Sequence, residues 1–263
     1  MSFLGRSLAG EVAYITGASS GIGQKTAERL ASLGARLALC ARRRSKLDDV
    51  VSALHARFPN LVVHAGECDV RDDDAVARWL SESERAVGAP TILVNSAGLA
   101  KGADKVVDAV VDDWDLMLDT NVRALARVTK RVIPGMIARG RGDVVMIGSV
   151  AGSDTYPGGS MYCASKAAVQ VFASALRKEL LGTPLRVMNM EPGLVDTEFS
   201  VVRFAGDAER AKKVYQGLTP LSPDDVADCI AFAVTRPLHM SLDRLLILAT
   251  DQAGATMVHR RAS

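Results

Sequence analysis

The sequence predicts a single α/β domain, built on a doubly wound, seven-stranded parallel sheet with helices on both faces. Short apolar segments alternate with longer segments of helical periodicity along the 263 residues. Glycine-rich or polar turns follow several of the apolar segments, and no linker, repeat or low-complexity stretch divides the chain. Such alternation indicates parallel strands joined by crossover helices.

The expected strands are short and mostly apolar, and they cover residues 12–16, 37–40, 61–65, 91–94, 143–147, 185–190 and 244–248. The expected helices cover residues 24–33, 45–58, 72–87, 112–139 and 161–181. A further helix begins at Ser222, a serine cap followed by Pro223 and two acidic residues. Pro134 lies inside the 112–139 segment, so we expect that helix to bend near Arg131.

Composition excludes several classes of protein. Apolar residues make up 48% of the chain, enough for a sizeable core, and the net charge of +2 argues against a dedicated nucleic-acid or polyanion binder. No apolar run reaches the ~18 residues that span a membrane, and residues 1–10 lack the apolar core of a signal peptide. We therefore expect a cytoplasmic protein that binds neither membranes nor nucleic acid.

Cysteine and histidine spacing gives no sign of a metal site. The four cysteines are far apart and read as free thiols in a reducing compartment: Cys40, Cys68, Cys163 and Cys229. The four histidines are scattered along the chain: His55, His64, His239 and His259. We expect no metal.

Tyr162 and Lys166 are the first candidate catalytic pair. The two residues are four positions apart near the start of an expected helix, so their side chains lie on the same helix face. An ammonium group beside a phenol favours the phenolate, so we expect Lys166 to lower the pKa of Tyr162 from about 10. Such a tyrosine can exchange protons with an alcohol or ketone. The same spacing is common on solvated helices, so other motifs must decide whether this pair is catalytic.

A glycine-rich turn follows the first strand and opens a helix. Its glycines follow the pattern Gly-x-x-x-Gly-x-Gly and allow close backbone approach to a pyrophosphate at the helix N-terminus. Outside this context the glycines would be ordinary turn residues. The turn predicts a dinucleotide site that includes Gly17, Ser19, Ser20, Gly21, Ile22 and Gly23.

The residues after the second strand indicate which dinucleotide binds. NAD enzymes usually carry an acid about ~20 residues after the glycines, but no Asp or Glu occurs between Glu28 and Asp48. Guanidinium groups pair bidentately with a 2′-phosphate, and Arg42 is the first candidate and Arg43 the second. The alternative is a solvated basic helix start, which is our interpretation of Arg44. The sequence therefore predicts NADP.

Two further loops follow the third and fourth strands, where strand ends meet a cofactor crevice. Asp69 and Val70 are expected to hold the adenine through a carboxylate and a backbone group. The segment Asn95, Ser96, Ala97 and Gly98 is expected to form a small, closely packed wall beside the cofactor. Either stretch alone would be an ordinary loop.

Taken together, these motifs resemble the classical short-chain dehydrogenase/reductases over nearly the whole chain. Asn121, Ser149 and Pro192-Gly193 also match, and twelve residues separate Ser149 from Tyr162 as in that family. The chain departs from the family pattern at two positions. Ser96 stands where the family usually has asparagine, and Gly148 stands where many members have serine. The resemblance implies a single-domain Rossmann fold over residues 1–263, with a cofactor half (about 1–150) and a catalytic and substrate half (about 150–263).

The same resemblance implies a role for each catalytic residue. Tyr162 would be the general acid or base, and Lys166 would lower its pKa and hold the nicotinamide ribose. Ser149 would bind the substrate oxygen, and Asn121 would help to hold a water that relays protons from Lys166. The alternatives are a core serine, a solvated helix asparagine and a packed tyrosine.

Residues after the sixth strand resemble the family's nicotinamide-side loop. Pro192, Gly193, Val195 and Thr197 would contact the nicotinamide, and residues 194–216 would form a mobile substrate lid. The family resemblance also implies a homotetramer, built on the helices at 112–139 and 161–181.

The C-terminal half is most similar to the NADP-dependent 3-hydroxy acid (serine, allo-threonine) dehydrogenases, which oxidise the C3 hydroxyl of small hydroxy acids. A carboxylate substrate calls for a cation, and Arg203 on the lid is a candidate; equally, Arg203 could tie the lid to Glu198 or Asp207. A reductase of bulkier ketones or aldehydes in specialised metabolism is the alternative. A third is an NADP-binding regulatory protein without turnover.

Overall fold

The computed structural model describes residues 6–261. Its seven strands form one sheet in the order β3-β2-β1-β4-β5-β6-β7, and every neighbouring pair is parallel. The doubly wound sheet is therefore confirmed. The strands are β1 (Val12–Thr16), β2 (Arg36–Ala41), β3 (Val63–Glu67), β4 (Ile92–Asn95), β5 (Gly142–Ile147), β6 (Leu185–Pro192) and β7 (Arg244–Ile247).

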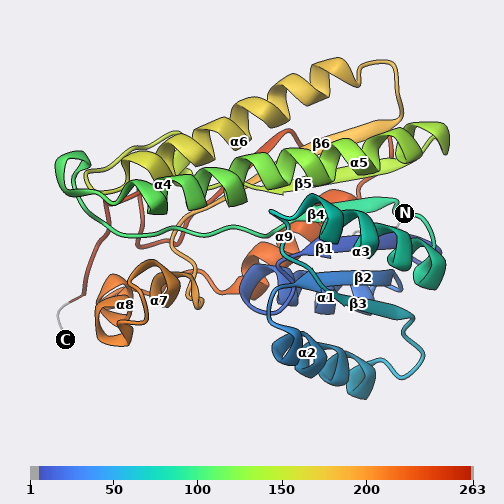
Figure 1. Cartoon of the computed structure of the whole chain (residues 1–263), viewed down its shortest axis with the longest axis horizontal. Helices are drawn as coiled ribbons and strands as arrows, with labels where there is room; N and C mark the ends of the chain where they lie inside the picture. The colour runs from blue at the N-terminus through green and yellow to red at the C-terminus, as the bar shows by residue number, and fades with distance from the viewer. Residues whose placement is uncertain (1–5, 262–263) are drawn as a thin grey trace.

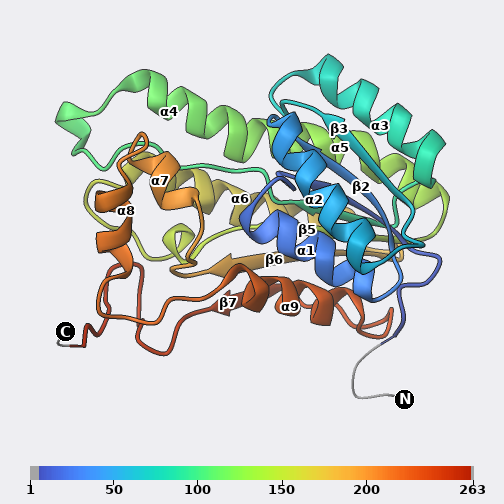
Figure 2. The same cartoon turned by 90° about the horizontal axis from the view of Figure 1, so that it is seen from below.

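Helices cover both faces of the sheet (Figures 1 and 2). On one face lie α1 (Gly21–Ser32), α2 (Arg44–Arg57) and α9 (Pro223–Val234), and on the other α3 (Asp73–Val87), α5 (Leu125–Ala138) and α6 (Ser160–Glu179). Successive β1 residues alternate between the two cores: Ala13 and Ile15 face α1, whereas Val12 and Tyr14 face the other layer. Burial on both faces explains why the strands are continuous apolar runs.

The third strand lies two residues later than expected. Residues 61–65 were predicted, but the chain turns after α2, where the Leu61 N–H donates to the Phe58 carbonyl over 3.0 Å. Leu61 therefore remains in the loop, and β3 pairs with β2 from Val63 to Glu67. In the sequence, an apolar residue that lies in a turn and packs against the core cannot be distinguished from an apolar residue that begins a strand.

The predicted helix at 112–139 is interrupted, but not near Arg131. It consists of α4 (Val111–Leu118), a π-helical turn (Asp119–Ala124) and α5, which runs through Pro134 without interruption. A π turn inserts one residue into the helix and often marks a functional site. Here it places Asn121 at the discontinuity, and the bend expected near Arg131 stays a prediction.

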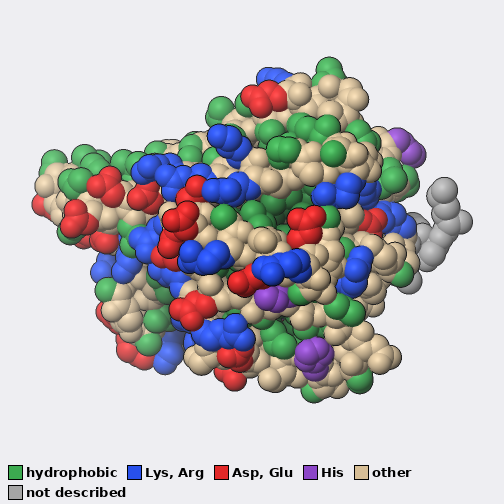
Figure 3. All heavy atoms as spheres, turned by 45° about the vertical axis from the view of Figure 1, so that its right-hand side comes forward, with side chains coloured by type: hydrophobic (Ala, Val, Ile, Leu, Met, Phe, Trp, Pro, Cys, Tyr) green, Lys and Arg blue, Asp and Glu red, His purple; other side chains and the backbone are tan. Residues whose placement is uncertain are grey.

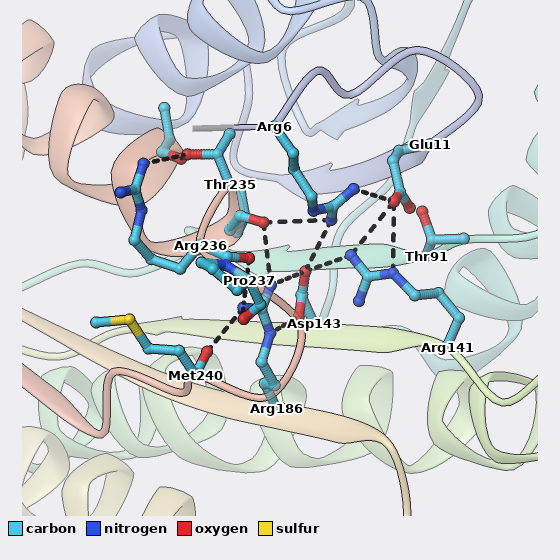
Figure 4. Close-up of polar contacts among 12 residues, drawn as sticks. Arg6, Glu11, Thr91, Arg141, Asp143, Arg186, Thr235, Arg236, Pro237 and Met240 are labelled. Atoms are coloured by element: carbon cyan, nitrogen blue, oxygen red, sulfur yellow. Dashed lines mark hydrogen bonds and ion pairs between the residues drawn. The ribbon is translucent and has the colours of Figure 1, made fainter. Parts of the chain in front are cut away.

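The amino ends of the strands meet in a buried ion network (Figure 4). Asp143 at the start of β5 is fully buried, and its carboxylate accepts from Arg186 Nε at 2.6 Å, Arg186 Nη2 at 2.8 Å and Arg141 Nη2 at 2.7 Å. Arg141 also contacts Glu11, which pairs with Arg6. Because these side chains lie at the opposite end of the strands from the predicted site, their role is structural.

The lid predicted at 194–216 contains two short helices, α7 (Phe199–Arg203) and α8 (Ala208–Tyr215), which the sequence analysis did not predict. The start of α9 agrees with prediction, because Ser222 and Asp225 form a reciprocal capping box.

The surface carries charges of both signs. On the face shown in Figure 3, Lys and Arg side chains are interspersed with Asp and Glu side chains, in keeping with the net charge of +2. Between residues 6 and 261, no helix combines the length and apolarity needed to cross a membrane. Over the same residues, no cluster of His, Cys, Asp and Glu side chains has the arrangement of a metal site. Of the 1–10 segment, residues 1–5 lie outside the described residues.

Candidate active site

A cavity of about 650 Å³ opens at the carboxyl ends of the strands. This is the edge where ligands bind in doubly wound sheets, at the point where the strand order reverses. The predicted residues that line it are Gly17, Ser19, Ser20, Gly21, Ile22, Arg42, Arg43, Asp69, Val70, Ala97, Gly98, Ser149, Tyr162, Lys166, Pro192, Gly193, Val195, Thr197 and Arg203. Three others lie behind its wall: Gly23, Asn95 and Asn121.

The glycine-rich turn is closed too tightly for side chains. Gly17 has φ +67°, and a Cβ there would lie 2.8 Å from Ala97 Cα. A Cβ on Gly23 would lie 2.5 Å from the Gly17 carbonyl oxygen, so Gly23 closes the turn from behind. Ser20 precedes α1 without capping it through its side chain. The first N–H groups of α1 therefore remain available to an anion, which suits a pyrophosphate.

Arg43 crosses the mouth of the cavity. Its Nη2 donates to Ser20 Oγ at 2.9 Å and to Ser19 Oγ at 3.3 Å, and its Nη1 donates to Glu198 Oε2 at 2.8 Å. Lys46 on α2 also pairs with Glu198. Lys46 and Arg43 together lower the pKa of Glu198 to about 2. This pairing was not predicted from the sequence, where Glu198 was expected only as a partner of Arg203.

Asp69 sits beside the other predicted arginine. Its carboxylate accepts from Arg71 Nη2 at 2.6 Å, and this pairing, with a smaller contribution from Arg42, holds its pKa below the usual range. Asn95 is 3% exposed, and its Nδ2 donates to Thr129 Oγ1 at 3.0 Å. Asn95 therefore supports the wall of the cavity from within, and its predicted contact with a cofactor stays a prediction.

Ser149, Tyr162 and Lys166 all line the cavity, and all three are buried. Ser149 follows β5, and the other two lie one turn apart on α6. Burial raises the pKa of Tyr162, and its hydrogen bond with Ser149 opposes the shift. Burial lowers the pKa of Lys166 to about 8, and its Nζ donates to the Ile147 carbonyl at 2.8 Å.

The expectation that Lys166 lowers the pKa of Tyr162 was therefore wrong. Lys166 Nζ lies 5.9 Å from the centroid of the Tyr162 ring. Both groups are desolvated, which disfavours the ammonium as well as the phenolate. The largest effect on Tyr162 is its burial, which raises its pKa.

Asn121 holds the loop that follows β4. Its Oδ1 accepts from the Leu99 N–H at 2.9 Å, and its Nδ2 donates to the Leu99 carbonyl at 2.8 Å and to Ser165 Oγ at 3.0 Å. The π turn thus links the cavity wall at Leu99 to α6. The water that Asn121 was expected to hold stays a prediction.

Arg203 faces Tyr162 from the segment predicted to be a lid. It donates to Tyr156 Oη at 2.9 Å and to the Gly102 carbonyl at 3.0 Å, and its guanidinium carbon lies 6.0 Å from the Tyr162 ring centroid. The expected alternative partners were wrong: Glu198 pairs with Arg43, and Asp207 caps α8. Arg203 does tie the lid down, but to the loops beside the active site.

Several cavity residues were missed from the sequence. Phe199 packs against Tyr162 with ring centroids 5.6 Å apart, and Tyr156 bonds Arg203. Aromatic residues near the catalytic motifs were a usable signal for both. The C-terminal segment also contributes Ala255, Thr256, Val258 and Arg260. That segment has neither periodicity nor a motif, so nothing in the sequence marked it.

Comparisons with known proteins identify the family of this chain. The profile of the short chain dehydrogenase family matches residues 11–207. The NADP-dependent 3-hydroxy acid dehydrogenase of Schizosaccharomyces pombe is 40% identical over 255 residues, which cover 97% of this chain and 98% of that protein. Sulfoacetaldehyde reductase 2 of Chromohalobacter salexigens is 41% identical over 244 residues, which cover 92% of this chain and 96% of that protein.

A solved structure also resembles this chain over most of its length. The closed form of serine dehydrogenase complexed with NADP+ aligns with a TM-score of 0.89 and 37% identity, covering 95% of this chain and 100% of that chain. Together with the profile match and the motifs that meet in the cavity, this likeness shows that the chain belongs to the short chain dehydrogenase family.

Proposed function

We propose that this protein is an NADP(H)-dependent oxidoreductase that interconverts an alcohol and a carbonyl group in small 3-hydroxy acids. The observation that carries the proposal is the position of Arg203, whose guanidinium carbon lies 6.0 Å from the Tyr162 ring centroid in the same cavity. A fixed cation beside a proton-transfer group suits an anionic substrate. The relatives named as 3-hydroxy acid and serine dehydrogenases support the same substrate class.

The residues that line the cavity fit NADP along its length. The Gly17–Gly23 turn and the start of α1 would hold the pyrophosphate, Arg42 and Arg43 the 2′-phosphate, and Asp69 and Val70 the adenine. Lys166 would hold the nicotinamide ribose, and Pro192, Gly193, Val195 and Thr197 would surround the nicotinamide. When bound, NADP accepts the hydride that leaves the alcohol carbon.

The side chains of this chain supply the acid–base chemistry. In the direction of reduction, Tyr162, which its raised pKa keeps protonated, gives its hydroxyl proton to the substrate oxygen, while Ser149 bonds the same oxygen and stabilises the charge on it. In the direction of oxidation, Tyr162 accepts the substrate's hydroxyl proton as its own proton passes toward Lys166. With its pKa near 8, Lys166 can gain or lose a proton under physiological conditions and can pass one onward from Tyr162. Arg203 holds the substrate carboxylate, and Phe199 shields the tyrosine from water.

A reductase of small anionic aldehydes is the second candidate. The sulfoacetaldehyde reductase 2 relative is as similar as the hydroxy acid dehydrogenase. Arg203 would pair with a sulfonate as readily as with a carboxylate. The two candidates share the tetrad and cofactor and differ in the group that the lid recognises.

We also infer a cytoplasmic homotetramer. Ile137, Val171 and Leu181 on or beside α5 and α6 are 42%, 67% and 88% exposed, as side chains that pack against another subunit would be in one protomer. A mass of four chains by light scattering would support this assembly, and a monomer would contradict it.

A substrate panel tests the proposed function. Purified protein is incubated with NADP and, separately, L-serine, L-allo-threonine, 3-hydroxybutyrate and 3-hydroxyisobutyrate, while NADPH absorbance is followed. In parallel, NADPH consumption is measured with sulfoacetaldehyde and with uncharged ketones. We expect the protein to oxidise at least one hydroxy acid with NADP, and we expect this activity to disappear when NAD replaces NADP. Turnover of uncharged carbonyls alone would move the function to the reductase of bulkier substrates.

A further inference from the structure

Glu198 joins two segments that lie far apart in the sequence. Its carboxylate, at the base of the lid, accepts from Arg43 at 2.8 Å and pairs with Lys46, both near the start of α2. All three side chains are 43–45% exposed, which places them at the mouth of the cavity. We call these two ion pairs the Glu198 clasp.

The clasp lies over the glycine-rich turn. Arg43 also donates to Ser19 and Ser20 of that turn. The residue before Glu198 packs on it as well, since a Cβ built on Gly21 would lie 3.3 Å from Thr197 Cγ2. The base of the lid thus covers the site proposed for the pyrophosphate, and the clasp fixes this cover to α2. The pairs persist through neutral pH, because the pKa of Glu198 falls to about 2.

We propose that the Glu198 clasp is the gate for cofactor exchange, so that NADP(H) enters and leaves only when Glu198 separates from Arg43 and Lys46. This inference rests on the proposed cofactor site. Exposed ion pairs are individually weak and weaken further with salt. Two such pairs are too weak to lock the cavity permanently, yet strong enough to slow release by roughly tenfold, since 1.4 kcal/mol is a factor of ten.

NADPH release measures the gate without any turnover. Protein loaded with NADPH is mixed with excess NADP, and the loss of bound-NADPH fluorescence gives the dissociation rate. Glu198→Gln removes both pairs, and Lys46→Met removes only one and lies outside the proposed cofactor contacts. Asp48→Asn is the matched control, because Asp48 is an exposed acid on the same helix that pairs with Arg44 at 2.8 Å.

At low salt we expect Glu198→Gln to release NADPH on the order of tenfold faster than wild type, Lys46→Met to lie between them and Asp48→Asn to match wild type. Lys46→Met should add nothing in the Glu198→Gln background. About 1 M salt should speed wild-type release and leave Glu198→Gln nearly unchanged.

The contrary outcomes separate the two proposals. Wild-type release in Glu198→Gln, with NADPH still bound by the cavity, would overturn the gate and leave the cofactor site standing. Equal acceleration by Asp48→Asn would also overturn the gate, because it would reflect net charge alone. Failure of the wild-type protein to bind NADPH would overturn the cofactor site and the gate together.

Discussion

Lys166 Nζ donates to the Ile147 carbonyl oxygen at 2.8 Å, so the ammonium of α6 is fixed to the end of β5, two residues before Ser149. This contact aligns Lys166 with the strand that leads to Ser149, and we propose that both are catalytic. It provides one acceptor for a group that is otherwise desolvated, and burial accordingly lowers the pKa of Lys166 to about 8.

The buried lysine predicts a pH dependence of stability. Its pKa falls from 10.5 in the unfolded chain to about 8 in the folded protein. The free energy of unfolding therefore decreases as pH falls from above 10.5 through 8, since the unfolded chain keeps the proton more readily. At about 1.4 kcal/mol per pKa unit, the loss approaches roughly 3 kcal/mol at neutral pH.

Urea unfolding of wild type and Lys166→Met at about pH 7 and about pH 9.5 checks this. We expect the stability of wild type relative to the variant to rise by about 2 kcal/mol over that interval. The raised pKa of Tyr162 places its own contribution above pH 10, outside the interval. A difference between the proteins that does not change with pH would contradict the account of Lys166.

Arg203→Ala tests how the substrate is held. Removing the guanidinium should raise the KM for a 3-hydroxy acid by about tenfold to a hundredfold, because a charge-assisted hydrogen bond is worth about 1.5–3 kcal/mol. An uncharged secondary alcohol should show little change in KM. If both KM values rise equally, Arg203 acts only by tying the lid to Gly102 and Tyr156.

Asp143→Ala tests the ion network at the amino ends of the strands. The change leaves Arg186, which is 4% exposed, without its carboxylate partner, and a buried pair broken on one side costs about 3–5 kcal/mol. Chemical denaturation should show this loss. Asp48→Ala, which breaks an exposed pair, should behave like wild type, and equal losses in the two variants would refute the proposed importance of burial.

Gly148→Ser tests a departure from the family pattern. A Cβ at Gly148 would lie 2.6 Å from Asn189 Oδ1, and Asn189 is buried and donates to Glu191 at 2.6 Å. The serine should cost about 1–3 kcal/mol in stability through overpacking. Adding Asn189→Ala to the Gly148→Ser protein should recover part of the lost stability. A stable Gly148→Ser protein would mean that Asn189 moves aside freely.

Much of the fold could be predicted, because buried parallel strands and amphipathic helices leave strong local patterns. The errors came where packing decided between similar patterns. Leu61 is apolar but packs from a turn, so β3 begins later than expected. The π turn at Asn121 depends on hydrogen bonds to Leu99 and Ser165, which are distant in sequence.

The parts of the site that are encoded by short sequence motifs could be predicted, and the parts that depend on distant residues could not. The glycine turn and the Tyr162–Lys166 pair are short motifs, and the structure brings them into one cavity. The pKa of Tyr162 was misjudged because burial is a property of the folded protein. The partners of Glu198 and Arg203 come from segments at least 45 residues away, and spacing alone could not reveal them.

The central claim is that Tyr162 transfers the substrate proton, and Tyr162→Phe tests it most directly. The variant keeps the ring that packs against Phe199 and removes the hydroxyl. With NADPH binding shown to be intact by fluorescence, we measure kcat for the best hydroxy acid found in the panel. We expect kcat to fall about 10²–10⁴-fold, which is typical for removal of a general acid–base group. Turnover close to wild type would contradict it.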